Sequence, residues 1–254
     1  MPINDARINL RSARERVCED GLGRCWEIGN ISGEEALMDI SKVTYFLNNY
    51  PSILGDEGAF RLGNCYVQLG DFLEAQRQYE RSIVNMFGTR PFWKIAGQVD
   101  LLVDTCVLSG REDLLGDVLK ELELYKKIPN KGNSALAMFA YGLTELLVPS
   151  GWDLSNSIKG LLKKPKWKIT YAAGQVLQSI TDGNSLGLNS TLPELLKAHE
   201  GSAKHGELRE TAEGLICMQA MALAYAALKR KLKIEIENEY FSKGYLEFLL
   251  SRTA

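Results

Sequence analysis

A regular spacing of small and large side chains in residues 59–83 restricts the fold of this chain more than any other feature. Gly63 and Tyr66 lie about one helical turn apart, and so do Ala75 and Tyr79. Gly70 separates the two sets and predicts a turn between two helices. Small residues let two helix backbones approach, and the tyrosines fill the space around them. The segment therefore predicts an antiparallel helix pair, which must bury its apolar face against further helices.

The predicted pair resembles a single tetratricopeptide (TPR)-like repeat, the unit of solenoids whose concave surfaces bind other proteins. Gly110 lies 40 residues after Gly70 and predicts a second, less regular pair around it. Arg61 and Asn64 are the residues that we expect to face the groove of such a solenoid. Only one repeat matches well, whereas about three are needed for a stable groove. A TPR-type adaptor or chaperone that holds a peptide is therefore an alternative function.

Helix start and stop signals recur along the chain and predict an all-α fold of stacked antiparallel helix pairs, a TPR-like α-solenoid. Capping boxes at 32–35, 71–74 and 191–194 predict helix starts, with Pro193 in a first turn. We expect one domain over residues 1–254, with a TPR-like half at 1–130 and a C-terminal helical half at 131–254. Glycine and proline residues separate about twelve segments with helical spacing, namely 5–28, 33–49, 56–69, 71–87, 92–108, 112–127, 134–148, 153–162, 168–181, 192–205, 211–230 and 242–251.

Composition and charge restrict the class of protein further. The chain has 254 residues, 45% of them hydrophobic, which is ample for a packed core. A net charge of −2 gives no reason to expect nucleic acid as the main ligand. Five cysteines without CxxC spacing indicate reduced, buried thiols rather than a disulfide framework.

Two segments bear on localisation. The longest apolar run, 215–228, is shorter than the roughly 20 residues of a membrane span and predicts a buried core helix. Residues 1–20 are charged and lack the apolar stretch of a signal peptide, so we expect a cytoplasmic protein. Residues 233–238 alternate with period two, but the helices on either side favour an extended connector over a strand.

Residues with catalytic or metal-binding chemistry are scattered and predict neither an enzyme nor a cofactor or metal. His199 and His205 lie on different faces of a helix, and no Asp or Cys near them completes a zinc site, so we expect surface or capping roles. A cysteine–histidine pair remains open, although no cysteine lies in a recognisable nucleophile elbow. We see no carboxylate alone in an apolar run, where burial would raise its pKa for acid–base work.

A lysine-rich segment, 159–168, surrounds Trp167. Lysines beside an aromatic ring can follow a nucleic-acid backbone, which makes an enzyme acting on nucleic acid a third hypothesis. The alternative is a solvated helix end with Trp167 packed on the next helix. We favour it because the rest of the chain has no extended basic stripe.

Acidic residues recur at helical spacing on two consecutive predicted helices. Like charges four residues apart repel each other by about 0.2–0.5 kcal/mol per pair, and no lysine or arginine is clearly in register with them. Such an unneutralised ridge can attract a basic partner and speed its capture. Ordinary solvated faces are the alternative interpretation. The residues of this predicted ridge are Asp100 and Asp104 on one helix and Asp113, Asp117 and Glu121 on the next.

The C-terminal third carries a family resemblance over residues 167–180 and 192–241. The sequences that carry it are HGELRET (205–211), EGLIC (213–217) and ALAY (222–225). They resemble the immunity protein 49 family of bacterial polymorphic toxin systems. Gln219 stands where we expect a proline in that family.

This resemblance implies an all-α protein, made beside a secreted toxin, that protects the producing cell by binding the toxin's C-terminal domain. It implies no catalytic residue. We expect a one-to-one complex that occludes the toxin's active site, with no nucleic acid or membrane as partner. From the residues themselves, Glu207, Arg209, Glu210 and Glu213 form a charged collar at a predicted helix start, with Thr211 as a candidate N-cap. The collar is a helix cap or a contact for the toxin.

Overall fold

The computed structural model describes residues 51–89, 99–126, 134–206, 208 and 212–253, and this part of the chain is all-helical. The predicted segments 5–28 and 33–49, with the capping box 32–35, lie outside it. Ten α-helices and two short 3-10 helices are present in the described part: α3 (Pro51–Leu69), α4 (Phe72–Thr89), α6 (Val99–Leu108), η2 (Glu112–Leu114), α7 (Leu115–Lys126), α8 (Ala135–Leu147), α9 (Leu154–Leu162), α10 (Lys168–Thr181), α11 (Ser185–His205), η3 (Ala212–Leu215), α12 (Met218–Lys229) and α13 (Lys243–Thr253).

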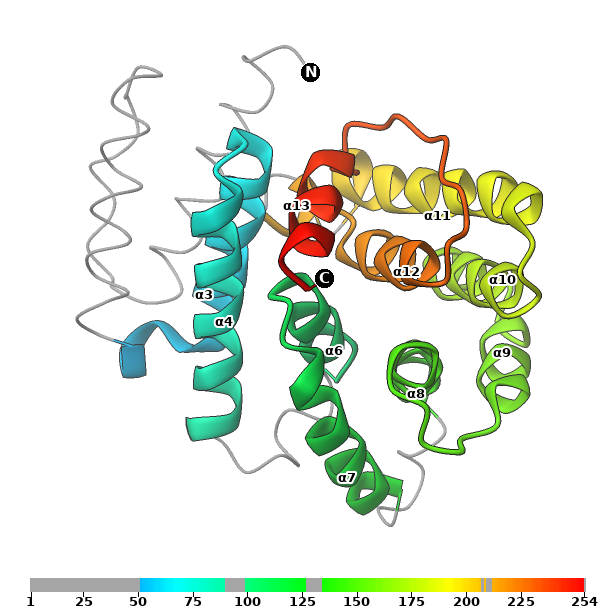
Figure 1. The fold of residues 1–254 in the computed structure, drawn as a ribbon, viewed down its shortest axis with the longest axis horizontal. Coiled ribbons are helices and arrows are strands. Elements are labelled where there is room, and N and C mark those ends of the chain that lie inside the picture. The colour runs from blue at the N-terminus through cyan, green and yellow to red at the C-terminus, as the bar shows by residue number, and fades with distance from the viewer. Residues whose placement is uncertain (1–50, 90–98, 127–133, 207, 209–211, 254) are drawn as a thin grey trace.

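Helices α3 and α4 form the pair that the spacing of small and large residues predicts, and they lie side by side in Figure 1. A Cβ atom on Gly63 would lie 2.6 Å from Cε1 of Tyr79, so the two helices meet where only glycine fits. The Tyr79 hydroxyl donates a hydrogen bond to Oδ1 of Asn64 at 2.7 Å, inside the pair. Asn64 is fully buried. The expectation that Asn64 faces a groove is therefore wrong.

Three helices end in the same way, at glycines where the sequence predicts breaks. Gly70, Gly110 and Gly183 have positive φ angles of 79°, 76° and 64°. The amide after each glycine donates to a carbonyl oxygen five residues earlier, as in Asp71 to Tyr66 at 3.0 Å. This Schellman geometry needs a left-handed residue, which glycine adopts without strain.

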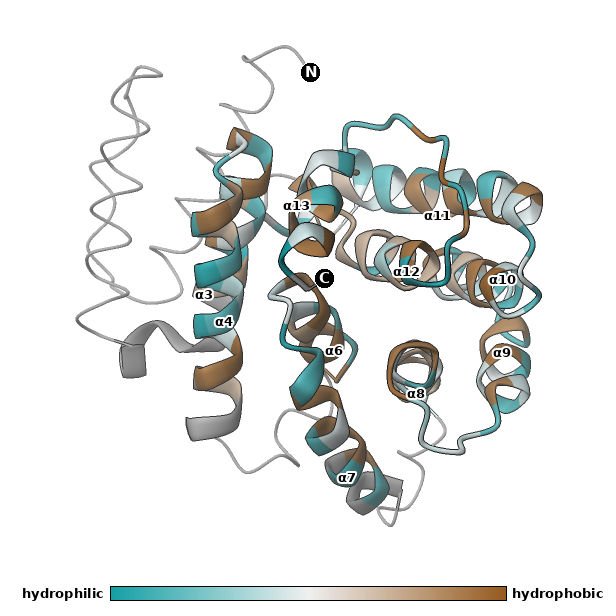
Figure 2. Ribbon diagram, in the orientation of Figure 1, coloured by the Kyte–Doolittle hydropathy of each residue, from teal (hydrophilic) through white to brown (hydrophobic). Residues whose placement is uncertain are grey.

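Helix α12 lies at the centre of the fold and contacts α6, α8, α10, α11 and α13 (Figure 1). It carries most of the apolar run 215–228 and is buried from Ala220 to Ala227, as that run predicts. Helix α8 is buried except at Leu136 and Leu147, and Figure 2 shows it almost wholly brown. One contiguous core extends through the described helices. None of the described helices has the length and hydropathy of a membrane-spanning segment.

Three predicted helix starts are wrong. Helix α3 begins at Pro51 rather than at residue 56. Helix α11 begins at Ser185, where Oδ1 of Asn184 accepts from the Gly187 amide at 2.9 Å. Pro193 therefore lies well inside the helix, and Thr191 donates back to the Gly187 carbonyl instead of capping. The segment predicted as one helix from 211 to 230 is η3 followed by α12, with a break at residues 216–217.

Residues 233–238 form the extended connector that the sequence favours, with Ile234 and Ile236 buried. The side chain of Asn189 on α11 takes the place of a neighbouring strand. Its Oδ1 accepts from the Glu235 amide at 2.8 Å, and its Nδ2 donates to the Lys233 carbonyl at 2.9 Å.

Candidate binding cavity

A cavity of about 490 Å³ opens where α3, α6, α11, η3 and the start of α12 meet. This volume lies within the range of small-molecule pockets, about 300–1,000 Å³. The apolar part of the lining, referred to as the apolar wall, includes Phe60, Leu101, Ile169 and Ile216. The polar part of the lining consists of Arg61, Asp100, Asp104, His199, Glu213 and Gln219.

Asp104 is the most unusual residue of this lining. Its side chain is only 2% exposed, in the middle of the apolar helix α6, and Oδ1 has no hydrogen-bond partner in the described part of the chain. Burial raises the pKa of this carboxyl well above its ordinary value, and the neighbouring charge of Asp100 raises it further. The sequence predicts Asp104 on an acidic surface ridge, and it predicts that no carboxylate lies alone in an apolar run. Both expectations are wrong, because α12 and α4 cover this face of α6.

Asp100 lies one turn before Asp104 and lines the same cavity. Burial raises its pKa as well, although hydrogen bonds from backbone amides and from Gln219 oppose the shift. Nε2 of Gln219 donates to Oδ2 of Asp100 at 3.3 Å, while Oε1 of Gln219 is buried without a partner. The part of the lining formed by Asp100, Asp104 and Gln219 therefore offers more hydrogen-bond acceptors than donors.

Arg61 and Glu213 form an ion pair across the cavity, between α3 and η3. Nε and a terminal nitrogen of Arg61 lie 2.8 and 2.7 Å from Oε1 of Glu213. The Arg61 side chain is 11% exposed and that of Glu213 is 33% exposed. Because Glu213 neutralises this guanidinium, the described lining provides no unpaired basic side chain opposite the two aspartates.

His199 is buried at 5% exposure, which contradicts the surface role expected for it, whereas His205 is exposed as predicted. Nε2 of His199 lies 3.3 Å from the Gly214 carbonyl oxygen. The rings of His199 and Tyr240 meet edge-on, with 5.2 Å between their centroids. Burial lowers the pKa of His199, so the ring is neutral at pH 7.

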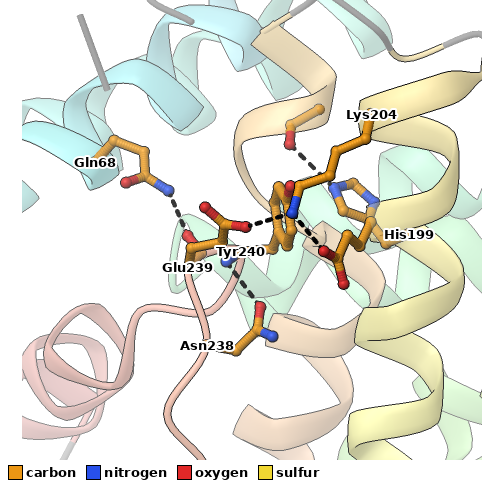
Figure 3. A network of polar contacts seen from close by, with 8 residues as sticks. Gln68, His199, Lys204, Asn238, Glu239 and Tyr240 are labelled. Carbon is orange, nitrogen blue, oxygen red and sulfur yellow. Dashed lines mark hydrogen bonds and ion pairs between the residues drawn. The ribbon is translucent and has the colours of Figure 1, made fainter. Parts of the chain in front are cut away.

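A network of polar contacts holds this side of the cavity in place (Figure 3). Nζ of Lys204 on α11 pairs with Glu239 at 3.3 Å, and Nε2 of Gln68 on α3 donates to the Glu239 carbonyl at 2.9 Å and to the Leu215 carbonyl at 2.8 Å. The Cys217 amide donates to the Tyr240 carbonyl at 3.0 Å. These bonds fix the break between η3 and α12 in an extended form.

The other predicted partner-binding residues do not join Asp100 and Asp104. Asp113 is exposed and paired with Arg111 through two bonds of 2.8 and 2.7 Å, and Asp117 is paired with Lys120 at 2.8 Å. The prediction of an unneutralised acidic ridge is therefore wrong. The Glu121 side chain, and Glu207, Arg209, Glu210 and Thr211, lie outside the described residues. Glu213 of the charged collar lines the cavity, and so does Leu208, which lies between collar residues in the sequence.

Two further expectations concern the lysine-rich segment and metals. Trp167 is 56% exposed, with Nζ of Lys164 4.6 Å from its ring centroid, so the predicted packing on the next helix is wrong. The described residues contain no group of three or more histidine, cysteine or acidic side chains placed to hold a metal ion.

The sequence contains a signal for the burial of the two aspartates, which the ridge prediction did not use. Residues 99–108, VDLLVDTCVL, are apolar at nearly every position except the two aspartates. A helix that is apolar on all sides is buried, so both carboxyls were candidates for burial. Gln219, inside the longest apolar run, gave the same signal.

Comparisons with known proteins return no relative of this chain. No protein-family model matches it, and neither the characterised proteins nor the solved structures include a significant match. The resemblance to immunity proteins thus rests on the residues given above.

Proposed function

We propose that this protein is an immunity protein that binds a cognate secreted bacterial toxin and neutralises it by covering the toxin's active site. One observation carries the proposal. Asp100 and Asp104 of the predicted ridge and Glu213 of the charged collar are separate candidates for partner contact in the sequence, and they line a single cavity. Leu208 and Glu213 lie within the sequence block that resembles the immunity family.

In this proposal the protein acts in the cytoplasm of the producing cell, in a one-to-one complex, without catalysis of its own. Its helix pairs form a TPR-like solenoid surface, and the cavity is the place where a side chain of the toxin is anchored. Anchors that enter a desolvated pocket contribute most of the affinity of protein complexes. The adaptor alternative has less support, because Asn64 is buried beneath Tyr79 and Arg61 is paired with Glu213.

The gene neighbourhood gives the first test. The adjacent upstream reading frame should encode a large secreted protein with a variable C-terminal domain. Co-expression of that domain should stop growth, and this chain should restore growth while giving no protection against an unrelated toxin. Failure of rescue with a toxic neighbour would contradict the proposal.

Variants then connect rescue to the cavity. We expect Asp100→Asn combined with Asp104→Asn to weaken rescue and complex formation together. Asp113→Asn combined with Asp117→Asn is the matched control, because it also replaces two aspartates but both lie outside the cavity. Rescue that persists without a detectable complex would instead indicate an enzyme that reverses the damage.

A further inference from the structure

We propose that the cavity binds an organic cation, namely a guanidinium or primary ammonium group on an aliphatic stem. The head group lies against Asp104 and Asp100, and the stem lies along the apolar wall. The site itself stands on the geometry of this chain. Only the source of the ligand, a side chain of the bound toxin, rests on the proposed function. A free small molecule of the same chemistry is the other source.

The first argument is the set of acceptors that face no donor. Oδ1 of Asp104 and Oε1 of Gln219 are both buried and have no hydrogen-bond partner in the described part of the chain. A buried polar atom without a partner carries a desolvation penalty that a native structure rarely tolerates. Both residues line the cavity, although the two atoms are buried from solvent, so a ligand there supplies the missing donors once these side chains rotate toward it. A guanidinium group has five N–H donors and no acceptor, which matches this set.

The second argument is charge. Asp100 shares a helix with Asp104, and within the described residues no side chain from another element balances the charge that the two carboxyls carry when they are ionised. The Tyr79 hydroxyl of α4 already donates to Asn64, Arg61 of α3 is paired with Glu213 of η3, and His199 of α11 is neutral. Cys217, at the start of α12, is protonated because burial raises its pKa to about 12. A bound cation supplies the missing positive charge.

The apolar wall fits the stem of such a cation. It includes Phe60, Leu101 and Ile169, which suit methylene groups. Lysine and arginine side chains bury their methylene stems along apolar surfaces of this kind. A bare divalent ion fits less well, because it prefers six or more oxygen ligands and would leave this wall unused. The apolar wall beside two carboxyls is therefore specific for a cation with an organic stem.

The test compares two probes of the same shape. Butylguanidinium should bind the full chain in calorimetric titrations, whereas butylurea, its neutral counterpart, should bind at least about tenfold more weakly because it has no positive charge to pair with the carboxylates. Asp104→Asn should remove this preference, and Asp113→Asn should keep it. Circular dichroism and urea unfolding confirm that each variant is folded. Equal binding of the two probes, or an unchanged preference in Asp104→Asn, would overturn the proposal.

A third probe identifies the source. Arginine capped at both ends, as N-acetyl-arginine methylamide, should bind at least as tightly as butylguanidinium if a protein side chain is the natural occupant. If butylguanidinium binds and capped arginine does not, the cation site stands and its ligand is a free small molecule. In that case the toxin proposal fails at this cavity without loss of the site.

Binding should also release protons. Burial raises the pKa of Asp104 and of Asp100 in the free protein. A cation favours the charged form and lowers both values. The binding heat should therefore depend on the ionisation enthalpy of the buffer in the direction of proton release, and the affinity of butylguanidinium should rise with pH. Proton uptake on binding would contradict the proposed placement of the head group.

Discussion

Asp104 occupies a position on α6 where its neighbours Val103 and Thr105 are fully buried, and it makes no ion pair there. Aspartate is almost never fully buried unless it is paired. A hydrophobic side chain at this position would be the stabilising choice, as it is for other buried charges. A carboxyl in the lining of this cavity therefore indicates a cost in stability, which the proposed ligand would offset.

The pH dependence of stability should show this cost. Because the native state raises the Asp104 pKa, the folded protein keeps a proton that the unfolded chain loses above its ordinary pKa of 3.8. Stability then falls as the pH rises from that value toward the folded pKa. Asp104→Asn should be the more stable protein at pH 8 in urea unfolding, and its advantage should shrink toward pH 4. A variant less stable than the parent at pH 8 would show that the carboxylate is stabilising.

Gly63 gives a second prediction at the scale of single residues. Gly63→Ala would place a Cβ atom 2.6 Å from Cε1 of Tyr79, a side chain that is fully buried and hydrogen-bonded to Asn64. Overpacking of this kind lowers stability by about 1–3 kcal/mol. Gly201→Ala is the matched control, because it lies inside α11 with no other atom within 4 Å of the new Cβ. It should raise stability by about 0.5–1 kcal/mol. Urea unfolding of both variants measures the contrast.

At the scale of elements, most helix positions could be predicted from the sequence. Helices α8, α9 and α10 agree with the segments 134–148, 153–162 and 168–181 to within about one residue at each end. Their ends carry local signals: Ser134 and Asp153 accept from amides in the first turns of α8 and α9, and Gly183 follows α10. Such signals act within a few residues, so a sequence alone is enough to place them.

The start of α11 shows where local signals compete. Residues 184–187 and residues 191–194 both offer a capping side chain followed by a helical segment, and the structure uses Asn184. The proline at 193 favoured the wrong choice, because proline is common in first turns. The break at Cys217 has a different cause. It depends on the bond from the Cys217 amide to the distant Tyr240 carbonyl, and no local pattern encodes this contact.

The connector 233–238 supplies a prediction at this scale. Asn189→Ala removes the bonds from the Asn189 side chain to the Glu235 amide and the Lys233 carbonyl, each with a net value of about 1 kcal/mol. The Glu235 amide should lose its protection from hydrogen exchange. Asn189→Asp keeps the acceptor and should retain that protection while losing the donated bond. Identical exchange in the two variants would exclude this role for Oδ1.

At the scale of the whole molecule, thiols report how cooperatively the core opens. Cys65 on α3 and Cys106 on α6 are 1% and 0% exposed, and burial raises the pKa of Cys106 to about 12. In a chain with Cys18→Ser and Cys25→Ser, both thiols should resist a thiol reagent at pH 8 and react at one common rate, set by unfolding. Peptide mass spectrometry after timed labelling measures each rate. Separate rates would show that the α3–α4 pair opens independently of α6.

The cavity walls come from segments spread over residues 60–219. A growing polypeptide therefore has no such recess until the start of α12 has left the ribosome and packed against α6. Whatever enters the recess meets only finished molecules, and synthesis of residues 1–200 alone yields nothing able to hold it. Truncated products that end before the start of α12 would lack part of the lining and should not bind the ligand.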